Sequence, residues 1–213
     1  METTLDIVSD VVCPWCWIGL RNLGAALEDI GDEISVETSF RPFFLDAGIP
    51  REGLAYNAYM DRKFPDKAAR AMALEHLQQA GAAVGVTFRF DKIAIRPNTL
   101  DAHRLIRWAQ GQGKAWQAKE ALFSTFFNEG LDIGNADVLA TIASSIGMDG
   151  DLVRDLLATD RDAGQIRREV MEAQAIGVRG VPTFIFGRRR GVSGAQPPEV
   201  LARLLRESAQ TGV

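Results

Sequence analysis

The chain has 213 residues, of which 46% are hydrophobic and 24% are charged, a composition typical of a globular protein with a sizeable core. The formal net charge is −4 and the longest basic run is only Arg188 to Arg190, which we interpret as a solvated turn. Nucleic acid and anionic membranes are therefore not expected partners. The first residues lack the basic and apolar segments of a secretory signal, and no apolar stretch could cross a bilayer, so the sequence predicts a cytoplasmic location.

The N-terminal segment predicts a strand, a helix and a second strand. Residues 5–12 are apolar and β-branched, which favours a short buried strand. The apolar residues that follow recur at helical spacing, and proline is favoured at the first helical position, so a helix is predicted to begin at Pro14 with Cys13 as its N-cap. Gly31 would end this helix, and residues 34–40 alternate as a second strand. A strand–helix–strand order implies a parallel pair.

Amphipathic helices dominate the middle of the chain, from about residue 45 to about residue 160. The predicted helices cover residues 54–63, 65–83, 98–111, 116–128, 136–146 and 151–158. Residues 88–90 favour either a brief strand or an extended segment. This block is too long to be a connection, so we expect an inserted helical subdomain of residues 45–160 within an α/β domain of residues 1–44 plus 161–213.

The C-terminal segment completes the α/β pattern. A helix over residues 163–176 is predicted to end at Gly177, since glycine tolerates positive φ. Residues 180–187 read as a loop that enters a strand, and residues 191–194 are its expected hairpin partner. A last helix begins at Pro197 or Pro198.

The two cysteines, Cys13 and Cys16, lie together at the predicted strand-to-helix junction. A helix N-terminus presents unpaired N–H groups and the positive end of the dipole, and both favour a thiolate at Cys13. The Cys-X-X-Cys spacing places Cys16 one helical turn later, where it can attack Cys13 in a mixed disulfide. Cys13 is thus the predicted attacking thiol and Cys16 the predicted resolving thiol, with Pro14 and Trp15 between them.

The cysteine pair also admits two roles without redox exchange. It could be half of a zinc site, but zinc takes about four ligands and the histidines, His76 and His103, are distant in the sequence. The sequence therefore predicts no metal. The pair could instead be buried and inert, although a strand-to-helix junction is an unusual place for that role.

Four segments resemble a DsbA-type protein of the thioredoxin superfamily, and specifically its cytoplasmic FrnE-like branch. They are residues 13–19 (CPWCWIG), 98–105 (NTLDAHRL), 177–184 (GVRGVPTF) and 191–196 (GVSGAQ). The resemblance implies a thioredoxin-like fold with a large all-helical insertion, as in DsbA. It also implies that Val181–Pro182 is a cis peptide that faces the sulfurs and leaves the Val181 backbone open to a substrate chain, where residues alone would allow an ordinary trans proline.

The resemblance implies an enzyme that exchanges disulfides with protein or peptide thiols, by oxidation, reduction or isomerisation. No cofactor is expected beyond the redox-active dithiol, with glutathione as a conceivable co-substrate, and the protein would be a monomer or a homodimer. The architecture is also similar to that of 2-hydroxychromene-2-carboxylate isomerase and kappa-class glutathione transferases. A glutathione-dependent isomerase or transferase is therefore the alternative, with Asn98, Thr99 and Arg104 lining a cleft for a small molecule. A third hypothesis is a binding module whose dithiol only senses redox state.

Overall fold

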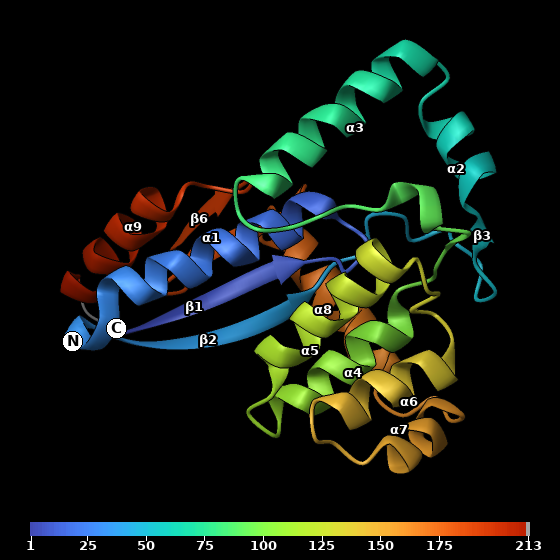
Figure 1. Ribbon diagram of the computed structural model, residues 1–213. Coiled ribbons are helices and arrows are strands. Elements are labelled where there is room, and N and C mark those ends of the chain that lie inside the picture. The colour runs from blue at the N-terminus through green and yellow to red at the C-terminus, as the bar shows by residue number, and fades with distance from the viewer. Residues whose placement is uncertain (212–213) are drawn as a thin grey trace. The chain divides into compact units, whose positions relative to one another are not determined.

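The computed structural model describes residues 1–211 and divides the chain into two compact units (Figure 1). The first unit joins Met1–Leu45 to Glu169–Val213, and the second is Asp46–Arg168. The sequence-based boundary at residues 160 and 161 thus precedes the boundary between the units, which falls within helix α8 (Ala163–Ala175).

The first unit is built on a sheet with the strand order β2-β1-β5-β6. Its strands are β1 (Glu2–Ser9), β2 (Ser35–Pro42), β5 (Thr183–Phe186) and β6 (Arg190–Ser193). As predicted, β1 and β2 are parallel and β5 and β6 form an antiparallel hairpin. β5 also pairs antiparallel with β1, so the last part of the chain returns to the centre of the sheet.

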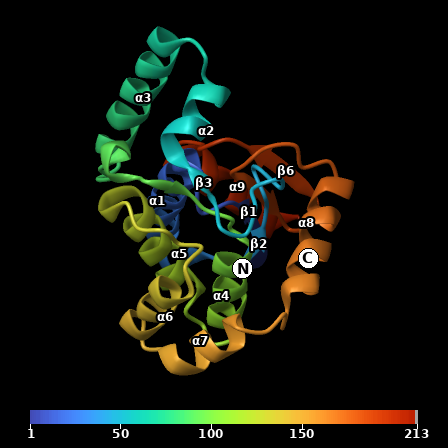
Figure 2. The ribbon, with the colours of Figure 1, turned by 90° about the vertical axis from the view of Figure 1, so that its right-hand side faces the viewer.

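Helices α1 (Pro14–Ile30) and α9 (Pro198–Gln210) pack together on one face of this sheet (Figure 1). Successive side chains of a strand point to opposite faces, so Leu5 and Phe186, which are paired in the register, share this face and are fully buried. On the other face, Val8 joins Ala173 in the C-terminal half of α8 in a second apolar cluster. Figure 2 shows the C-terminal half of α8 on the side of the sheet away from α1.

The second unit consists mainly of helices, with one small addition. The helices are α2 (Tyr56–Lys63), α3 (Lys67–Ala82), α4 (Leu100–Gln110), α5 (Ala115–Ser124), α6 (Ala136–Ser145), α7 (Gly150–Leu157) and the first half of α8. The predicted helix at residues 54–63 begins two residues late, because Leu54 and Ala55 form strand β3 (Leu54–Ala55), which pairs with β4 (Ile95–Arg96). A pairing of two residues is too short to leave a pattern in the sequence.

The core of the second unit contains a cluster of phenylalanine rings. The rings of Phe88 and Phe90 stack at 5.2 Å, and both meet the Phe127 ring edge to face. The strand that residues 88–90 allowed is not formed, since Phe90 opens a 3₁₀ turn (Phe90–Lys92). After α5 the chain continues as a π-helical turn (Thr125–Glu129), so the predicted helix over residues 116–128 is interrupted there.

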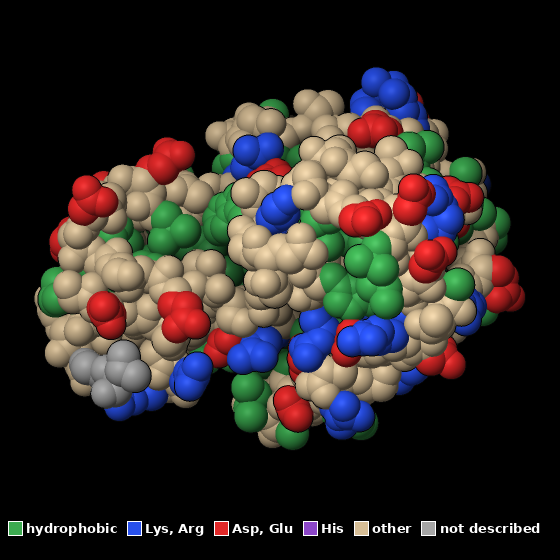
Figure 3. Space-filling view, turned by 90° about the horizontal axis from the view of Figure 1, so that it is seen from below, with side chains coloured by type: hydrophobic (Ala, Val, Ile, Leu, Met, Phe, Trp, Pro, Cys, Tyr) green, Lys and Arg blue, Asp and Glu red, His purple; other side chains and the backbone are tan. Residues whose placement is uncertain are grey.

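The surface carries mixed charge. Figure 3 shows acidic and basic side chains interspersed over the face in view, without a broad region of either sign among the residues drawn in colour. Within residues 1–211, no helix combines the length and the apolar character needed to cross a membrane.

Candidate dithiol site

Cys13 is the N-cap of α1, as the sequence predicted. Its backbone is extended, with φ −98° and ψ 111°, and Pro14 occupies the first helical turn, where no N–H is needed. The carbonyl oxygen of Cys13 accepts the backbone N–H of Cys16 at 3.0 Å. This turn brings the second thiol back toward the first, and the structure shows no disulfide between them.

A loop that is remote in the sequence closes over the first thiol. The Cys13 thiol donates to the carbonyl oxygen of Val181, with 3.6 Å between sulfur and oxygen. The Val181–Pro182 peptide bond is cis. Cys13 and Cys16 are only 5% and 2% exposed, whereas Pro14, Trp15 and Val181 are half-buried. The structure therefore brings together all six residues that the sequence singled out around the dithiol: Cys13, Pro14, Trp15, Cys16, Val181 and Pro182.

The pKa of Cys13 lies below its ordinary value of 9.0. The largest cause is a hydrogen bond from the Cys16 thiol, which favours a negative sulfur, and the backbone N–H groups of Cys16 and Trp15 act in the same direction. Burial opposes them and raises the pKa, because a charge is poorly solvated away from water. Hydrogen bonds to the sulfur outweigh its desolvation, so Cys13 is poised to ionise more readily than an ordinary thiol.

Asp10 is a further residue of this site, and sequence reasoning did not single it out. Its side chain is 1% exposed at the end of β1, where one carboxylate oxygen accepts the backbone N–H of Leu45 at 2.9 Å. Its carbonyl oxygen accepts the N–H of Cys13 at 3.2 Å. The negative charge of Asp10 raises the pKa of Cys13, against the hydrogen bonds to the sulfur. The sequence shows only an aspartate within the segment predicted as a buried strand, and its position does not tell that the carboxyl lies beside a thiol.

Hydroxyl groups hold the loop that carries Val181 and Pro182. The Thr183 hydroxyl donates to the Gly180 carbonyl oxygen at 2.7 Å and lies 2.8 Å from the Ser193 hydroxyl on β6. The N–H of Gly194 donates to the Pro182 carbonyl oxygen at 2.8 Å. These contacts tie the loop to the neighbouring hairpin strand and fix the position of the carbonyl that faces the thiol.

Gly19 allows this loop to approach helix α1. A Cβ atom at position 19 would lie 3.0 Å from Cγ of Pro182 and 3.3 Å from the Phe184 ring, closer than side chains normally pack. One turn further along α1, the Asn22 amide donates to the Gln196 carbonyl oxygen at 2.9 Å. Both contacts join the dithiol helix to the C-terminal part of the unit.

The predicted small-molecule cleft of Asn98, Thr99 and Arg104 lies in the second unit. Asn98 and Arg104 do border a common cavity, of about 90 Å³. The Asn98 side chain, however, donates to the Ile49 carbonyl oxygen at 2.7 Å and accepts the N–H of Leu100 at 3.0 Å. Thr99 is buried as the N-cap of α4. Ligand pockets usually enclose about 300–1,000 Å³, so this cavity is small for glutathione.

The Arg104 guanidinium makes its hydrogen bonds within the protein. Its side chain is 1% exposed and donates to the carbonyl oxygens of residues at and beyond the end of α7, as well as to Asp101 at 2.8 Å. The carbonyl acceptors are those of Leu156, Leu157, Thr159 and Arg161. The guanidinium therefore satisfies the C-terminal end of α7, where carbonyl groups lack partners within the helix.

His103 is buried on α4 beside Arg104 and is remote in the sequence from the two cysteines. In the described part of the chain, residues 1–211, no group of three or more His, Cys, Asp or Glu side chains is placed to hold a metal ion.

Comparison with known proteins identifies the family to which this chain belongs. The model of the family described as "DSBA-like thioredoxin domain" matches residues 4–206. A crystal structure titled as a probable DsbA oxidoreductase from Streptomyces coelicolor is 28% identical, with a TM-score of 0.88 that covers 99% of this chain and 92% of that chain.

Two more distant structures share the fold. The 2-hydroxychromene-2-carboxylate isomerase is 15% identical, with a TM-score of 0.71 that covers 99% of this chain and 100% of that chain. The cytosolic disulfide reductase DsbM from Pseudomonas aeruginosa, solved with GSH, is 17% identical, with a TM-score of 0.67 over 97% of this chain and 99% of that chain.

Proposed function

Since the chain belongs to the DSBA-like thioredoxin domain family of thiol oxidoreductases, we propose that it exchanges disulfides with protein or peptide thiols through Cys13 and Cys16. The observation that carries the proposal is the placement of Cys13. This thiol caps α1, has a lowered pKa, stands one turn before a second thiol and contacts the Val181 carbonyl oxygen at 3.6 Å. These are the features that a nucleophilic thiol needs for exchange.

In the reducing direction, the Cys13 thiolate attacks one sulfur of a substrate disulfide. The Cys13–substrate S–S bond forms as the substrate S–S bond breaks, and the other substrate sulfur leaves as a thiolate that takes up a proton. The Cys16 thiolate then attacks the Cys13 sulfur and releases the second substrate thiol. The substrate gains two electrons and the protein ends with a Cys13–Cys16 disulfide. In the oxidising direction the same steps run in reverse.

Val181 supplies the backbone against which a substrate chain would align. Its carbonyl oxygen already lies beside the Cys13 sulfur, and its side chain is half-buried at the surface of the site. An extended chain that pairs with this backbone would bring its own sulfur to Cys13 by main-chain hydrogen bonds, with little demand on side-chain sequence. Pro14 and Trp15 follow Cys13 directly and are half-buried, and the exchange needs no cofactor beyond the dithiol.

A thiol such as glutathione would return the Cys13–Cys16 disulfide to the reduced form, with two thiols oxidised for each protein disulfide reduced. The similarity to a cytosolic reductase solved with GSH motivates this choice of reductant and a cytoplasmic setting.

The test follows the reduction of insulin disulfides with glutathione as electron donor. We expect turnover by the unaltered protein and loss to background in Cys13→Ser, since the attacking sulfur is gone. Cys16→Ser should accumulate a covalent adduct with the substrate at Cys13, because the resolving sulfur is missing. Mass spectrometry of a tryptic digest identifies the adduct.

Retention of activity in Cys13→Ser, or an adduct at Cys16 in preference to Cys13, contradicts the proposal. Thiol oxidation should be assayed with the same variants, because exchange can run in either direction. If neither assay shows turnover while a partner protein binds only one redox form, the dithiol acts as a sensor and the catalytic proposal is wrong.

The structural likeness to 2-hydroxychromene-2-carboxylate isomerase motivates a second candidate, a glutathione-dependent isomerase or transferase that acts on a small organic compound. Such an enzyme would have to bind glutathione in the absence of any disulfide substrate. Calorimetry with the Cys13→Ser, Cys16→Ser double variant separates the two, since the variant cannot exchange disulfides. Saturable glutathione binding would favour the second candidate, and its absence at millimolar concentration would exclude it.

A further inference from the structure

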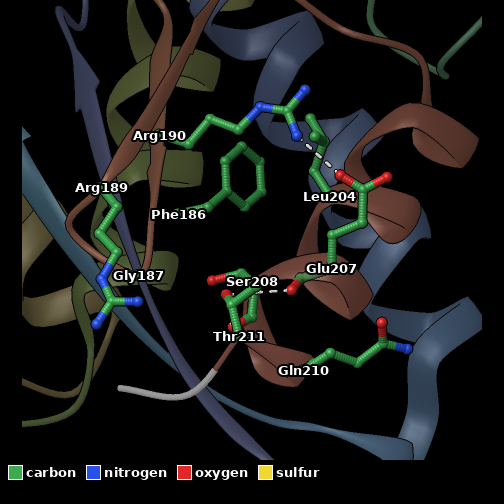
Figure 4. A pocket seen from close by; sticks show the side chains of 9 residues that line it. All are labelled: Phe186, Gly187, Arg189, Arg190, Leu204, Glu207, Ser208, Gln210 and Thr211. Carbon is green, nitrogen blue, oxygen red and sulfur yellow. Dashed lines mark hydrogen bonds and ion pairs between the residues drawn. The ribbon is translucent and has the colours of Figure 1, made fainter.

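A second cavity lies in the first unit, far along the sheet from the dithiol. It encloses about 350 Å³ between the β5–β6 turn and helix α9, and Figure 4 shows the residues that surround it. The N–H of Gly187 in this turn donates to the Thr4 carbonyl oxygen at 2.9 Å, so the cavity lies at the beginning of β1. Cys13 follows the other end of β1, which places the cavity outside the dithiol site.

The walls of the cavity are tied to each other. The Arg190 guanidinium on β6 donates to the Glu207 carboxylate on α9 at 2.8 Å, and the hydroxyls of Thr3 and Ser208 lie 2.7 Å apart. Gly187 has φ of 55°, and a Cβ atom there would lie 2.8 Å from the Ser208 hydroxyl, so only glycine lets the turn come this close to α9. The cavity is therefore formed by ordered elements on both sides, as most ligand pockets are.

Among the charged side chains around the cavity, Arg189 carries a positive charge that no acidic group of residues 1–211 neutralises. Glu207 accepts from both Arg190 and Arg203, so its negative charge is neutralised by arginines. Arg189 also lines the cavity, and within residues 1–211 it makes no ion pair and no side-chain hydrogen bond. Arg188 is exposed in the same turn, with φ of 57°. The sequence analysis interpreted the arginine run at residues 188–190 as a solvated turn. In the structure, Arg189 and Arg190 of this run also line a cavity.

The remaining lining is apolar on the inside. Phe186 and Leu204 form the inner wall beneath Arg190, and Gln210 and Thr211 stand at the edge (Figure 4). A guanidinium binds carboxylate and phosphate oxygens with two parallel hydrogen bonds, and an apolar wall favours a ring or a short alkyl group. We infer that this cavity binds a small organic anion, with its oxyanion on Arg189 and its apolar body against Phe186 and Leu204.

The test is an NMR titration of the ¹⁵N-labelled protein at physiological ionic strength. The probes are phenyl phosphate, benzoate, inorganic phosphate and, as the uncharged analogue, phenol. We expect saturable shifts of the Gly187, Ser208 and Thr211 amides with phenyl phosphate or benzoate. The tighter of these two shows whether the site prefers a phosphate or a carboxylate, and inorganic phosphate should bind more weakly because it has no apolar body.

The matched pair of variants is Arg189→Ala and Arg188→Ala. Both remove one positive charge from the same exposed turn, but only Arg189 lines the cavity. Arg189→Ala should weaken binding by roughly tenfold or more, since a charge-assisted bidentate contact is lost. Arg188→Ala should change it by less than about threefold, as expected for a screened surface charge. Insulin reduction should be unchanged in both.

Equal weakening in both variants would mean that the anion is attracted only by the overall charge of the turn, and the inference would be wrong. Phenol binding as tightly as phenyl phosphate would also overturn it, as would shifts that map to amides around Cys13. None of these results bears on the dithiol chemistry, which is read out separately by insulin reduction.

Discussion

The sulfur of Cys13 lies 3.6 Å from the carbonyl oxygen of Val181, although 168 residues separate the two in the chain. The contact belongs to the protonated thiol, which donates to the carbonyl. Ionisation would replace this donor with a negative sulfur facing a partial negative oxygen, so the contact with Val181 opposes what the Cys16 thiol favours. The Cys16 thiol therefore favours ionisation of Cys13, and the Val181 carbonyl oxygen opposes it.

The first prediction concerns the ionisation of Cys13. The pKa of Cys13 is below 9.0, so its rate of alkylation by iodoacetamide should reach half of its maximum below that pH. Cys16→Ala should move the midpoint upward, because the hydrogen bond from the Cys16 thiol is the largest cause of the lowered pKa. A midpoint at or above 9.0 in the unaltered protein would contradict the description of the site.

The same ionisation predicts how stability depends on pH. The folded protein has the lower pKa at Cys13, so the reduced protein releases this proton more readily when folded than when unfolded. Its free energy of unfolding should therefore rise as the pH increases through the ionisation of folded Cys13, and level off near 9.0. Urea titrations of the reduced protein measure this, with Cys13→Ala as the control that should lack this increment.

Asp10 gives the third prediction. Asp10→Asn removes a negative charge that raises the pKa of Cys13, but keeps an oxygen to accept the N–H of Leu45. The alkylation midpoint of Cys13 should move downward and its rate at acidic pH should increase. Asp32→Asn, a change at an exposed position on the same unit, should leave the midpoint unchanged. If the midpoint moves upward in Asp10→Asn, the charge of Asp10 does not raise the pKa of Cys13, and this description of the site is wrong.

Gly19 provides a steric test of the loop. Gly19→Ala should cost about 1–3 kcal/mol of stability and lower kcat/KM for insulin reduction, because the added methyl group displaces Pro182. Gly180→Ala is the matched control, since an added Cβ there meets nothing within 4 Å. Equal behaviour of the two variants in urea unfolding and in turnover would mean that the close approach of Gly19 to Pro182 has no importance.

Arg104 separates a structural role from a ligand-binding role. Arg104→Ala should lower the free energy of unfolding by about 3–5 kcal/mol, because several buried carbonyl oxygens and Asp101 lose their donor. Arg107→Ala on the same helix should cost about 1 kcal/mol or less, since its guanidinium is partly exposed and 3.8 Å from Asp162. A near-normal unfolding midpoint in Arg104→Ala, together with lost glutathione binding, would instead support the cleft that the sequence suggested.

The dithiol end of the fold could be predicted because its signals are local. Pro14 after Cys13 identifies the start of α1, and Gly31 identifies its end, where φ is 52°. The parallel pairing of β1 with β2 followed from the helix between them. The FrnE-like motifs identified the loop at Val181 and Pro182, which periodicity alone would have left as an ordinary turn before a strand.

The residues that escaped prediction have roles decided by tertiary contacts. The position of Asp10 in the sequence does not show that its carboxyl is buried beside a thiol. Likewise, nothing near Arg104 shows that the carbonyl oxygens it donates to lie more than fifty residues later. The cavity at Arg189 likewise depends on a helix that approaches from the end of the chain. The strands β3 and β4 have two residues each, too few for alternation to be visible.

The order of pairing in the sheet has a consequence for biosynthesis. β1 and α1 leave the ribosome before β5, the antiparallel neighbour of β1, which begins at Thr183. Until residues 181–193 have been synthesised, the two sulfurs therefore lack the Val181 carbonyl and the hairpin that later cover them. The nascent chain carries its reactive pair uncovered, so protection of these thiols from oxidants before release depends on the surrounding cell and not on the fold.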